Sequence, residues 1–128
     1  MAELFDGVSW AGVVSGAIAA FLLGWLWYSP KLFGAKWAEG VGVRMGAADE
    51  MPKAAMGVQV LGLFLVSWLV GVTAVSEALA TIILAVVAFS VMGYAGGMFR
   101  NNGRYARRVD AGYWLASVVV MVICQGIF

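Results

Sequence analysis

Long apolar runs, separated by short stretches that hold nearly all the charges, are the main pattern along this chain. Crossing about 30 Å of hydrocarbon takes about 20 helical residues. Four runs approach or exceed this length, at residues 8–28, 54–75, 78–99 and 111–128, the last being sufficient if it stands nearly upright. The runs are apolar on every face, whereas strands of a membrane barrel alternate. The pattern therefore predicts an all-α, polytopic integral membrane protein, with four transmembrane helices in a single domain of residues 1–128.

The break between the second and third runs is slight, because Ser76 and Glu77 are its only polar residues. The apolar stretch over residues 54–99 is too long for one span, so the chain must turn here. So short a connection predicts that the two helices are antiparallel neighbours.

Composition explains where so much apolar surface can go. The chain has 128 residues, of which 63% are hydrophobic and 12% are charged. Soluble domains are typically about half apolar and about a quarter charged, and a soluble domain this small could not bury the excess. Lipid is therefore the expected solvent. The net charge of +1 gives no sign of a nucleic-acid partner.

The basic residues define an expected orientation. All eight lie in two connections: Lys31, Lys36, Arg44 and Lys53 after the first run, and Arg100, Arg104, Arg107 and Arg108 after the third. The two ends of the chain and the Glu77 turn carry none. Because loops rich in Lys and Arg stay in the cytoplasm, both termini are predicted to face the periplasm.

The segment GWLWYSPKLFGAKW, residues 24–37, marks the expected exit from the bilayer. Aromatic rings favour the membrane interface. Ser29 is predicted to cap a short interfacial helix over about residues 30–39, with Pro30 as its first residue. The expected lipid contacts are Trp25, Trp27, Tyr28, Phe33 and Trp37. Arg104, Arg107 and Arg108 either bind anionic headgroups or only determine the orientation.

Small residues recur at four-residue spacing inside the runs, which lets helix backbones approach closely in lipid. They predict packing within the bundle, contacts between the subunits of a homo-oligomer, or both. The predicted packing residues are Gly12, Gly16, Ala20 and Gly24 in the first run, Gly93 and Gly97 in the third, and Gly112 in the fourth.

Candidate chemistry is sparse. The chain has no histidine, which is the commonest metal ligand and general base, and Cys124 is its only cysteine. No catalytic residue, metal site or cofactor is predicted. Gln59 is the strongest polar candidate and Asp110 the strongest ionisable one. Asp110 is expected to pair with Arg107 or Arg108, or to lie near the N-terminus of the fourth helix, where negative charge is favoured.

Two motifs resemble the bacterial family called Domain of Unknown Function 1761. The first is Trp-Tyr-Ser-Pro, followed by Leu-Phe-Gly and a further tryptophan, over residues 27–37. The second is Ala-Gly-Tyr-Trp, at residues 111–114. The resemblance implies a small four-span protein of the bacterial inner membrane. The family has no established activity, so it implies no catalytic residues.

Three functions remain open. The favoured one is a non-enzymatic homo-oligomer with a channel-like, transport or lipid-interacting role. A second is an accessory or scaffold subunit of a larger membrane complex. The third is an enzyme acting on lipid, with Asp110, Tyr113 and the nearby arginines facing Tyr28 and Ser29, but no nucleophile–base pair is visible. Bound acyl chains are expected against the aromatic residues of the segment at residues 24–37.

Overall fold

A computed structural model describes residues 2–29, 32–42 and 53–128, and their regular structure is entirely helical. Its elements are η1 (Ala2–Leu4), α1 (Trp10–Trp27), α2 (Gly34–Val41), α3 (Lys53–Val75), α4 (Leu79–Phe99) and α5 (Arg104–Ile127). The helices α1, α3, α4 and α5 are long and apolar enough to cross a membrane. The predicted all-α, four-span fold is confirmed.

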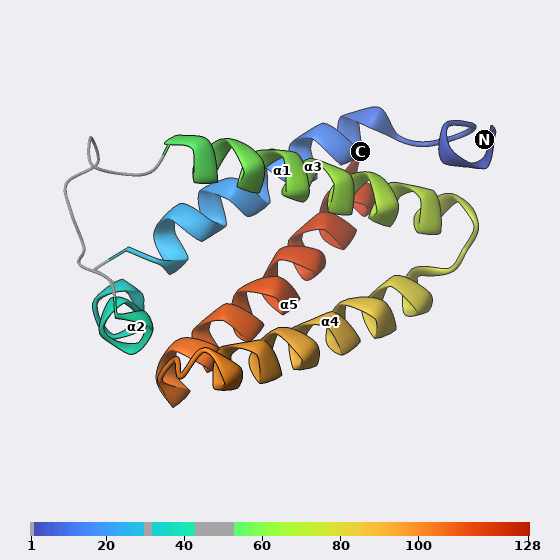
Figure 1. Cartoon of the computed structure of the whole chain (residues 1–128). Coiled ribbons are helices and arrows are strands. Elements are labelled where there is room, and N and C mark those ends of the chain that lie inside the picture. Colours follow the sequence, from blue (N-terminus) through green and yellow to red (C-terminus); the bar gives the residue numbers. More distant parts are fainter. Residues whose placement is uncertain (1, 30–31, 43–52) are drawn as a thin grey trace.

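Helix α1 packs against both α3 and α5, and α4 packs mainly against α5. Figure 1 shows α1 and α3 running side by side, while α5 crosses obliquely between them and α4. Ser9 begins α1, because its hydroxyl oxygen accepts a hydrogen bond from the Gly12 N–H at 3.2 Å. Between α1 and α3, the buried Ser67 hydroxyl donates to the Val13 carbonyl at 2.7 Å.

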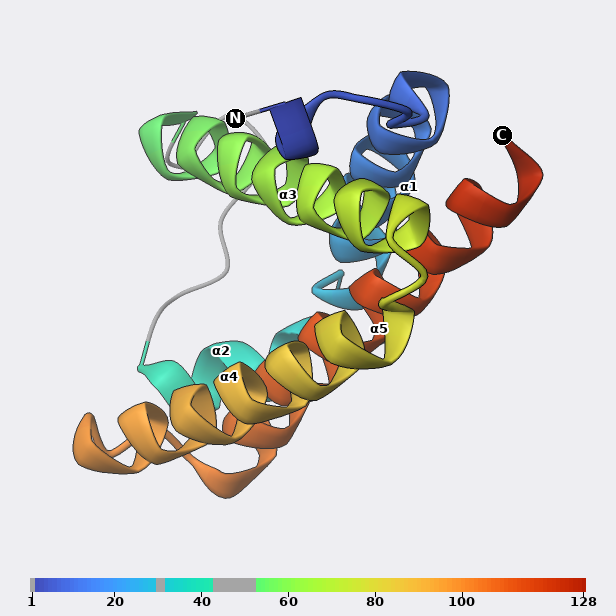
Figure 2. The same cartoon turned by 90° about the vertical axis from the view of Figure 1, so that its right-hand side faces the viewer.

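Helices α3 and α4 are joined by only three residues, Ser76–Ala78. The two predicted neighbours contact one another, but they diverge from this turn (Figure 2). Each packs more extensively on another helix than on its partner in the hairpin, α3 on α1 and α4 on α5. A short turn therefore joins the helix ends without setting the angle at which the helices leave it.

Most of the predicted packing residues contact a neighbouring helix. A Cβ atom added at Gly16 would lie 2.7 Å from the Ser67 hydroxyl oxygen, and one at Gly24 would lie 2.7 Å from the Tyr113 hydroxyl oxygen. Ala20 is fully buried. The remaining close approaches are Gly12 to Gln125, Gly97 to Arg107 and Gly112 to Trp27. These residues therefore pack within one chain.

Gly93 differs from the other predicted packing residues. A Cβ atom at this position would have no described atom within 4 Å outside its own helix. Gly93 therefore faces outward from α4, and its expected packing contact is not made within the described part of the chain.

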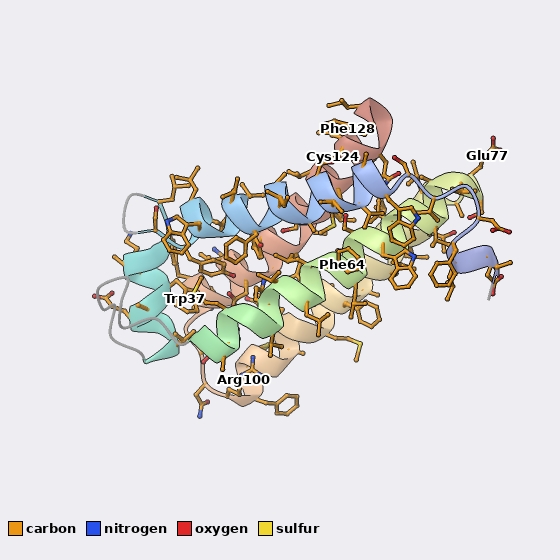
Figure 3. The ribbon with its side chains drawn as sticks, turned by 90° about the horizontal axis from the view of Figure 1, so that it is seen from above. Trp37, Phe64, Glu77, Arg100, Cys124 and Phe128 are labelled. Carbon is orange, nitrogen blue, oxygen red and sulfur yellow. The ribbon has the colours of Figure 1, made fainter. Side chains whose placement is uncertain are left out.

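The two ends of the bundle differ in charge. One end, here called the basic end, holds α2 and the turn between α4 and α5, which meet where the Gly103 N–H donates to the Gly40 carbonyl at 2.7 Å. The other, the acidic end, holds both chain termini and the α3–α4 turn. In Figure 3, Trp37 and Arg100 lie at the basic end and Glu77 lies at the acidic end. The cytoplasmic placement of the basic end remains a prediction.

The beginning of α2 differs from the prediction. The Ser29 hydroxyl donates to the Leu26 carbonyl at 2.7 Å, so it satisfies the end of α1 and does not cap a new helix. Helix α2 begins at Gly34, after a turn in which the Leu32 N–H donates to the Ser29 carbonyl at 3.1 Å. The predicted first residue of the interfacial helix, Pro30, lies outside the described residues.

Candidate functional site

Asp110 joins three helices at the basic end. The Tyr28 hydroxyl, at the end of α1, donates to Asp110 Oδ1 at 2.6 Å. The Trp37 indole N–H, from α2, donates to the same oxygen at 2.9 Å. Hydrogen bonds to an ionised carboxylate are shorter and about twice as strong as neutral ones. A single carboxylate oxygen on α5 therefore connects the end of α1 with α2.

Neither expected role of Asp110 is observed. Its side chain is directed to α1 and α2, whereas Arg107 is directed to α4, where its guanidinium lies 4.8 Å from the centre of the Tyr94 ring. Arg108 is exposed. Helix α5 begins at Arg104, so Asp110 lies in its second turn, beyond the first-turn positions at which the helix dipole favours negative charge.

Two further bonds connect α1 with α5. The Trp27 indole N–H donates to the Val109 carbonyl at 3.0 Å, and the Tyr113 hydroxyl donates to the Ala20 carbonyl at 2.7 Å. The Trp27 ring lies on Gly112, where a Cβ atom would approach it to 3.1 Å. The Ala-Gly-Tyr-Trp motif of α5 therefore packs against the aromatic end of α1.

The aromatic rings at this end pack on one another. The ring centroids of Tyr28 and Trp37 are 5.0 Å apart, and those of Tyr28 and Tyr113 are 5.5 Å apart, both in edge-to-face geometry. Trp27 and Phe33 are 5.0 Å apart. Each such pair stabilises a fold by about 0.5–1.5 kcal/mol beyond area burial. We call Trp27, Tyr28, Phe33, Trp37, Asp110 and Tyr113 the interface cluster.

Burial of the Tyr28 phenol, and then its hydrogen bond to the Asp110 carboxylate, raises the pKa of Tyr28 above its ordinary value of 10.0. A phenol donates at neutral pH in any case, and the raised pKa keeps the Tyr28 proton on its oxygen into alkaline solution. The interface cluster is an assembled joint between helices, with its donors and acceptor paired.

Gly34 is required where α2 approaches the end of α1. Its N–H donates to the Ser29 carbonyl at 2.9 Å. A Cβ atom at this position would collide with the backbone carbonyl of Tyr28. The glycine of the Leu-Phe-Gly motif therefore permits the turn that brings Trp37 to Asp110.

A second feature, here called the lateral cleft, lies between α3, α4 and α5. It has a volume of about 120 Å³, several times the roughly 10–15 Å³ that one water needs. Its walls are largely apolar, with Leu63, Val66, Val86, Trp114 and Met121. Its polar residues are Gln59 from α3, and Tyr113 and Ser117 from α5. Tyr113 therefore belongs to both the interface cluster and the lateral cleft.

The family comparison matches nearly the whole chain. A family model described as "Protein of unknown function (DUF1761)" covers residues 11–126. The chain belongs to the DUF1761 family. No curated protein and no solved structure shows significant similarity to it. The matched region includes every residue of the interface cluster and of the lateral cleft.

The residues predicted to contact lipid in this DUF1761 protein lie in two kinds of environment. Trp25 is 52% exposed and projects outward from α1, and Arg104 and Arg108 are also exposed. Trp27, Tyr28, Phe33 and Trp37 are partly buried in the interface cluster, and Arg107 is partly buried against Tyr94. The four clustered aromatic residues therefore hold helices together, in addition to any contact with lipid.

The lateral cleft was not predicted from the sequence. Gln59 and Ser117 are separated by about half of the chain, and no spacing rule connects them. The available signal was that both are polar residues within apolar runs, where polar side chains usually find partners on neighbouring helices.

Proposed function

We propose that this DUF1761 integral membrane protein is a non-enzymatic lipid-binding protein that holds an acyl chain in the lateral cleft. The position and lining of the cleft carry the proposal. Its three walls are helices long and apolar enough to cross a membrane. Hydrocarbon chains are the molecules that surround such helices, and a mainly apolar cleft is suited to one of them.

The arginines of the basic end supply a place for an anionic headgroup. Each basic residue near a membrane surface contributes about 1 kcal/mol of attraction to anionic lipid. Arg107 is suited to this role, because it lies on the face of α5 that contacts Tyr94 of α4. Its buried Nε has no hydrogen-bond partner among the described residues. A lipid with its phosphate near Arg107 would direct a chain along α5 toward the cleft.

The alternatives have weaker support. The small residues of α1 were the main reason to expect a homo-oligomer, and they pack within the chain, on Ser67, Tyr113 and Gln125. Homo-oligomer assembly remains a prediction. Tyr28 and Asp110 were candidates for lipid chemistry, and their bonds to one another and to Trp37 support a role in joining helices.

Filling the lateral cleft tests the proposal. Gly62 lines the cleft, and a Cβ atom there would meet no described atom within 4 Å, so Gly62→Leu is expected to add a side chain to the cleft. Gly57→Leu is the matched control, since Gly57 lies on the same helix, has the same free space and does not line the cleft. The purified proteins are titrated with phosphatidylglycerol in detergent, and the melting temperature is followed by tryptophan fluorescence.

We expect phosphatidylglycerol to raise the melting temperature of the wild type and of Gly57→Leu, and to raise that of Gly62→Leu much less. Phosphatidylcholine with the same chains should stabilise the wild type less, because it lacks net negative charge. Equal stabilisation of Gly62→Leu and Gly57→Leu would show that lipid binds elsewhere and would refute the proposal.

A further inference from the structure

The Ser117 hydroxyl of α5, like the Ser90 hydroxyl of α4, is buried without a hydrogen-bond partner among the described residues. Hydroxyls within membrane helices usually donate to a carbonyl in the preceding turn or to a neighbouring helix. Ser15 donates to the Gly12 carbonyl at 3.2 Å, and Thr73 donates to the Val70 carbonyl at 2.9 Å. Ser67 donates across to α1. Ser117 makes no hydrogen bond to any described residue, although it is only 4% exposed.

Ser117 lines the lateral cleft, so its unpaired hydroxyl can donate a hydrogen bond to a ligand bound there. Lipid hydrocarbon cannot accept this hydrogen bond, and a buried donor without a partner costs free energy. The neighbouring Tyr113 phenol donates its proton to the Ala20 carbonyl, and no hydrogen bond joins its oxygen to the Ser117 hydroxyl. The Gln59 amide, from α3, lines the same cleft and adds a second donor. The polar side of the cleft therefore offers two donors to a ligand oxygen, such as a carbonyl oxygen, that can only accept.

The depth of Ser117 narrows the class of ligand. It lies two helical turns beyond Asp110, about 10 Å along α5 at 1.5 Å per residue, and less in depth because α5 runs obliquely (Figure 1). Aromatic side chains such as those of the interface cluster lie at headgroup level. The headgroup region is roughly 5–7 Å thick on each side of the hydrocarbon. Ser117 is thus expected near the boundary between the hydrocarbon and the headgroups on the side of the basic end, where phospholipid chains are esterified to glycerol.

We infer that Ser117 donates a hydrogen bond to an ester carbonyl of the bound phospholipid, with the Gln59 amide as the second donor across the lateral cleft. The inference rests on the proposed lipid binding and adds to it a specific chemical selectivity. A diester phospholipid is recognised at this point, whereas a diether phospholipid, which lacks the carbonyl oxygen, is not.

The test compares diester and diether phosphatidylglycerols with identical chain lengths, each titrated into the purified full-length protein in detergent. One net hydrogen bond corresponds to about a two- to tenfold difference in affinity. We expect the wild type to bind the diester lipid more tightly by this factor. Ser117→Ala should lose most of this preference and keep only the part that the Gln59 amide supplies. Ser15→Ala, which alters a hydroxyl already bonded within α1, should keep the preference of the wild type.

Each result decides one of the two claims. Equal affinity of the wild type for the two lipids would overturn the ester recognition and leave acyl-chain binding intact. An unchanged ester preference in Ser117→Ala would overturn the assignment to Ser117. If neither lipid raises the melting temperature of the wild type, the proposed lipid binding itself fails, together with the inference. The comparison within the wild type does not depend on the folding of any variant.

Discussion

Helices α1 and α4 are both apolar spans that contain glycine, and the fold uses them differently. Gly16 of α1 is closely approached by Ser67 on α3 and by Met121 on α5. Gly93 of α4 has no described neighbour within 4 Å of where a Cβ would lie. Small residues therefore permit close packing, but whether it occurs depends on a partner helix being present.

This difference has a structural consequence for the lateral cleft. Helix α1 is held between α3 and α5, whereas the buried residues of α4 form a single stripe of Ile82, Val86, Ser90 and Gly97. Packing of α4 is mainly on α5. Helix α3 packs along α1, and helix α4 packs along α5. The two helices of the α3–α4 hairpin therefore separate, and the lateral cleft lies between them and α5.

The largest effect is expected from enlarging the glycines of the two helices. Gly16→Leu should destabilise the protein by several kcal/mol, because overpacking in a filled site costs about 1–3 kcal/mol or more, and the Met121 backbone lies only 3.4 Å from the new Cβ. Gly93→Leu should have little effect or a slight stabilising one, since glycine is a poor helix former. Thermal unfolding in detergent measures both. Similar losses for the two variants would contradict the distinction between α1 and α4.

The next effect concerns the joint that holds α1 to α5. Asp110→Leu removes the acceptor of both Tyr28 and Trp37. Leaving a buried donor unpaired costs about 1–3 kcal/mol, so we expect a loss of about 2–4 kcal/mol in the free energy of unfolding. Asp110→Asn keeps an acceptor oxygen and should lose about half as much. Equilibrium unfolding followed by tryptophan fluorescence gives both values, and equal losses would show that the charge of Asp110 matters more than the oxygen.

A smaller effect is expected between α1 and α3. Ser67→Ala removes the hydrogen bond to the Val13 carbonyl. Bonds between membrane helices contribute about 0.6 kcal/mol on average, so the expected loss is of that size. Thr73→Ala, which removes a bond within α3, serves as the control and should change the stability less. An equal change in the two variants would mean that the bond between α1 and α3 adds nothing.

The last effect is absent at neutral pH and appears only in alkali. The pKa of Tyr28 is raised in the folded state above 10.0. Above about pH 10 the unfolded chain therefore releases this proton while the folded chain retains it, so stability falls as the pH rises. Tyr28→Phe should show a shallower decline between pH 10 and 11. A decline equally steep in both proteins would assign the effect to other groups.

The amount that could be predicted from the sequence differs between the interface cluster and the cleft. The aromatic segment at residues 24–37 and the motif at residues 111–114 were both recognisable, but their connection through Asp110 was not. Asp110 was expected to pair with an arginine on its own helix, because sequence reasoning counts nearby charges. In the fold, Asp110 and Arg107 diverge around α5, and the donors to Asp110 come from residues more than 70 positions away.

The sequence alone determined the solvent of this protein and the number of its helices. In lipid each backbone group must be bonded within the protein, and runs of the required length that are apolar on every face meet this need as helices. The tertiary structure alone decided which helices are neighbours, which glycines are covered and where the cleft opens. In lipid no hydrophobic driving force distinguishes one apolar face from another. That choice therefore follows from close side-chain packing and from a few hydrogen bonds between residues far apart in the chain.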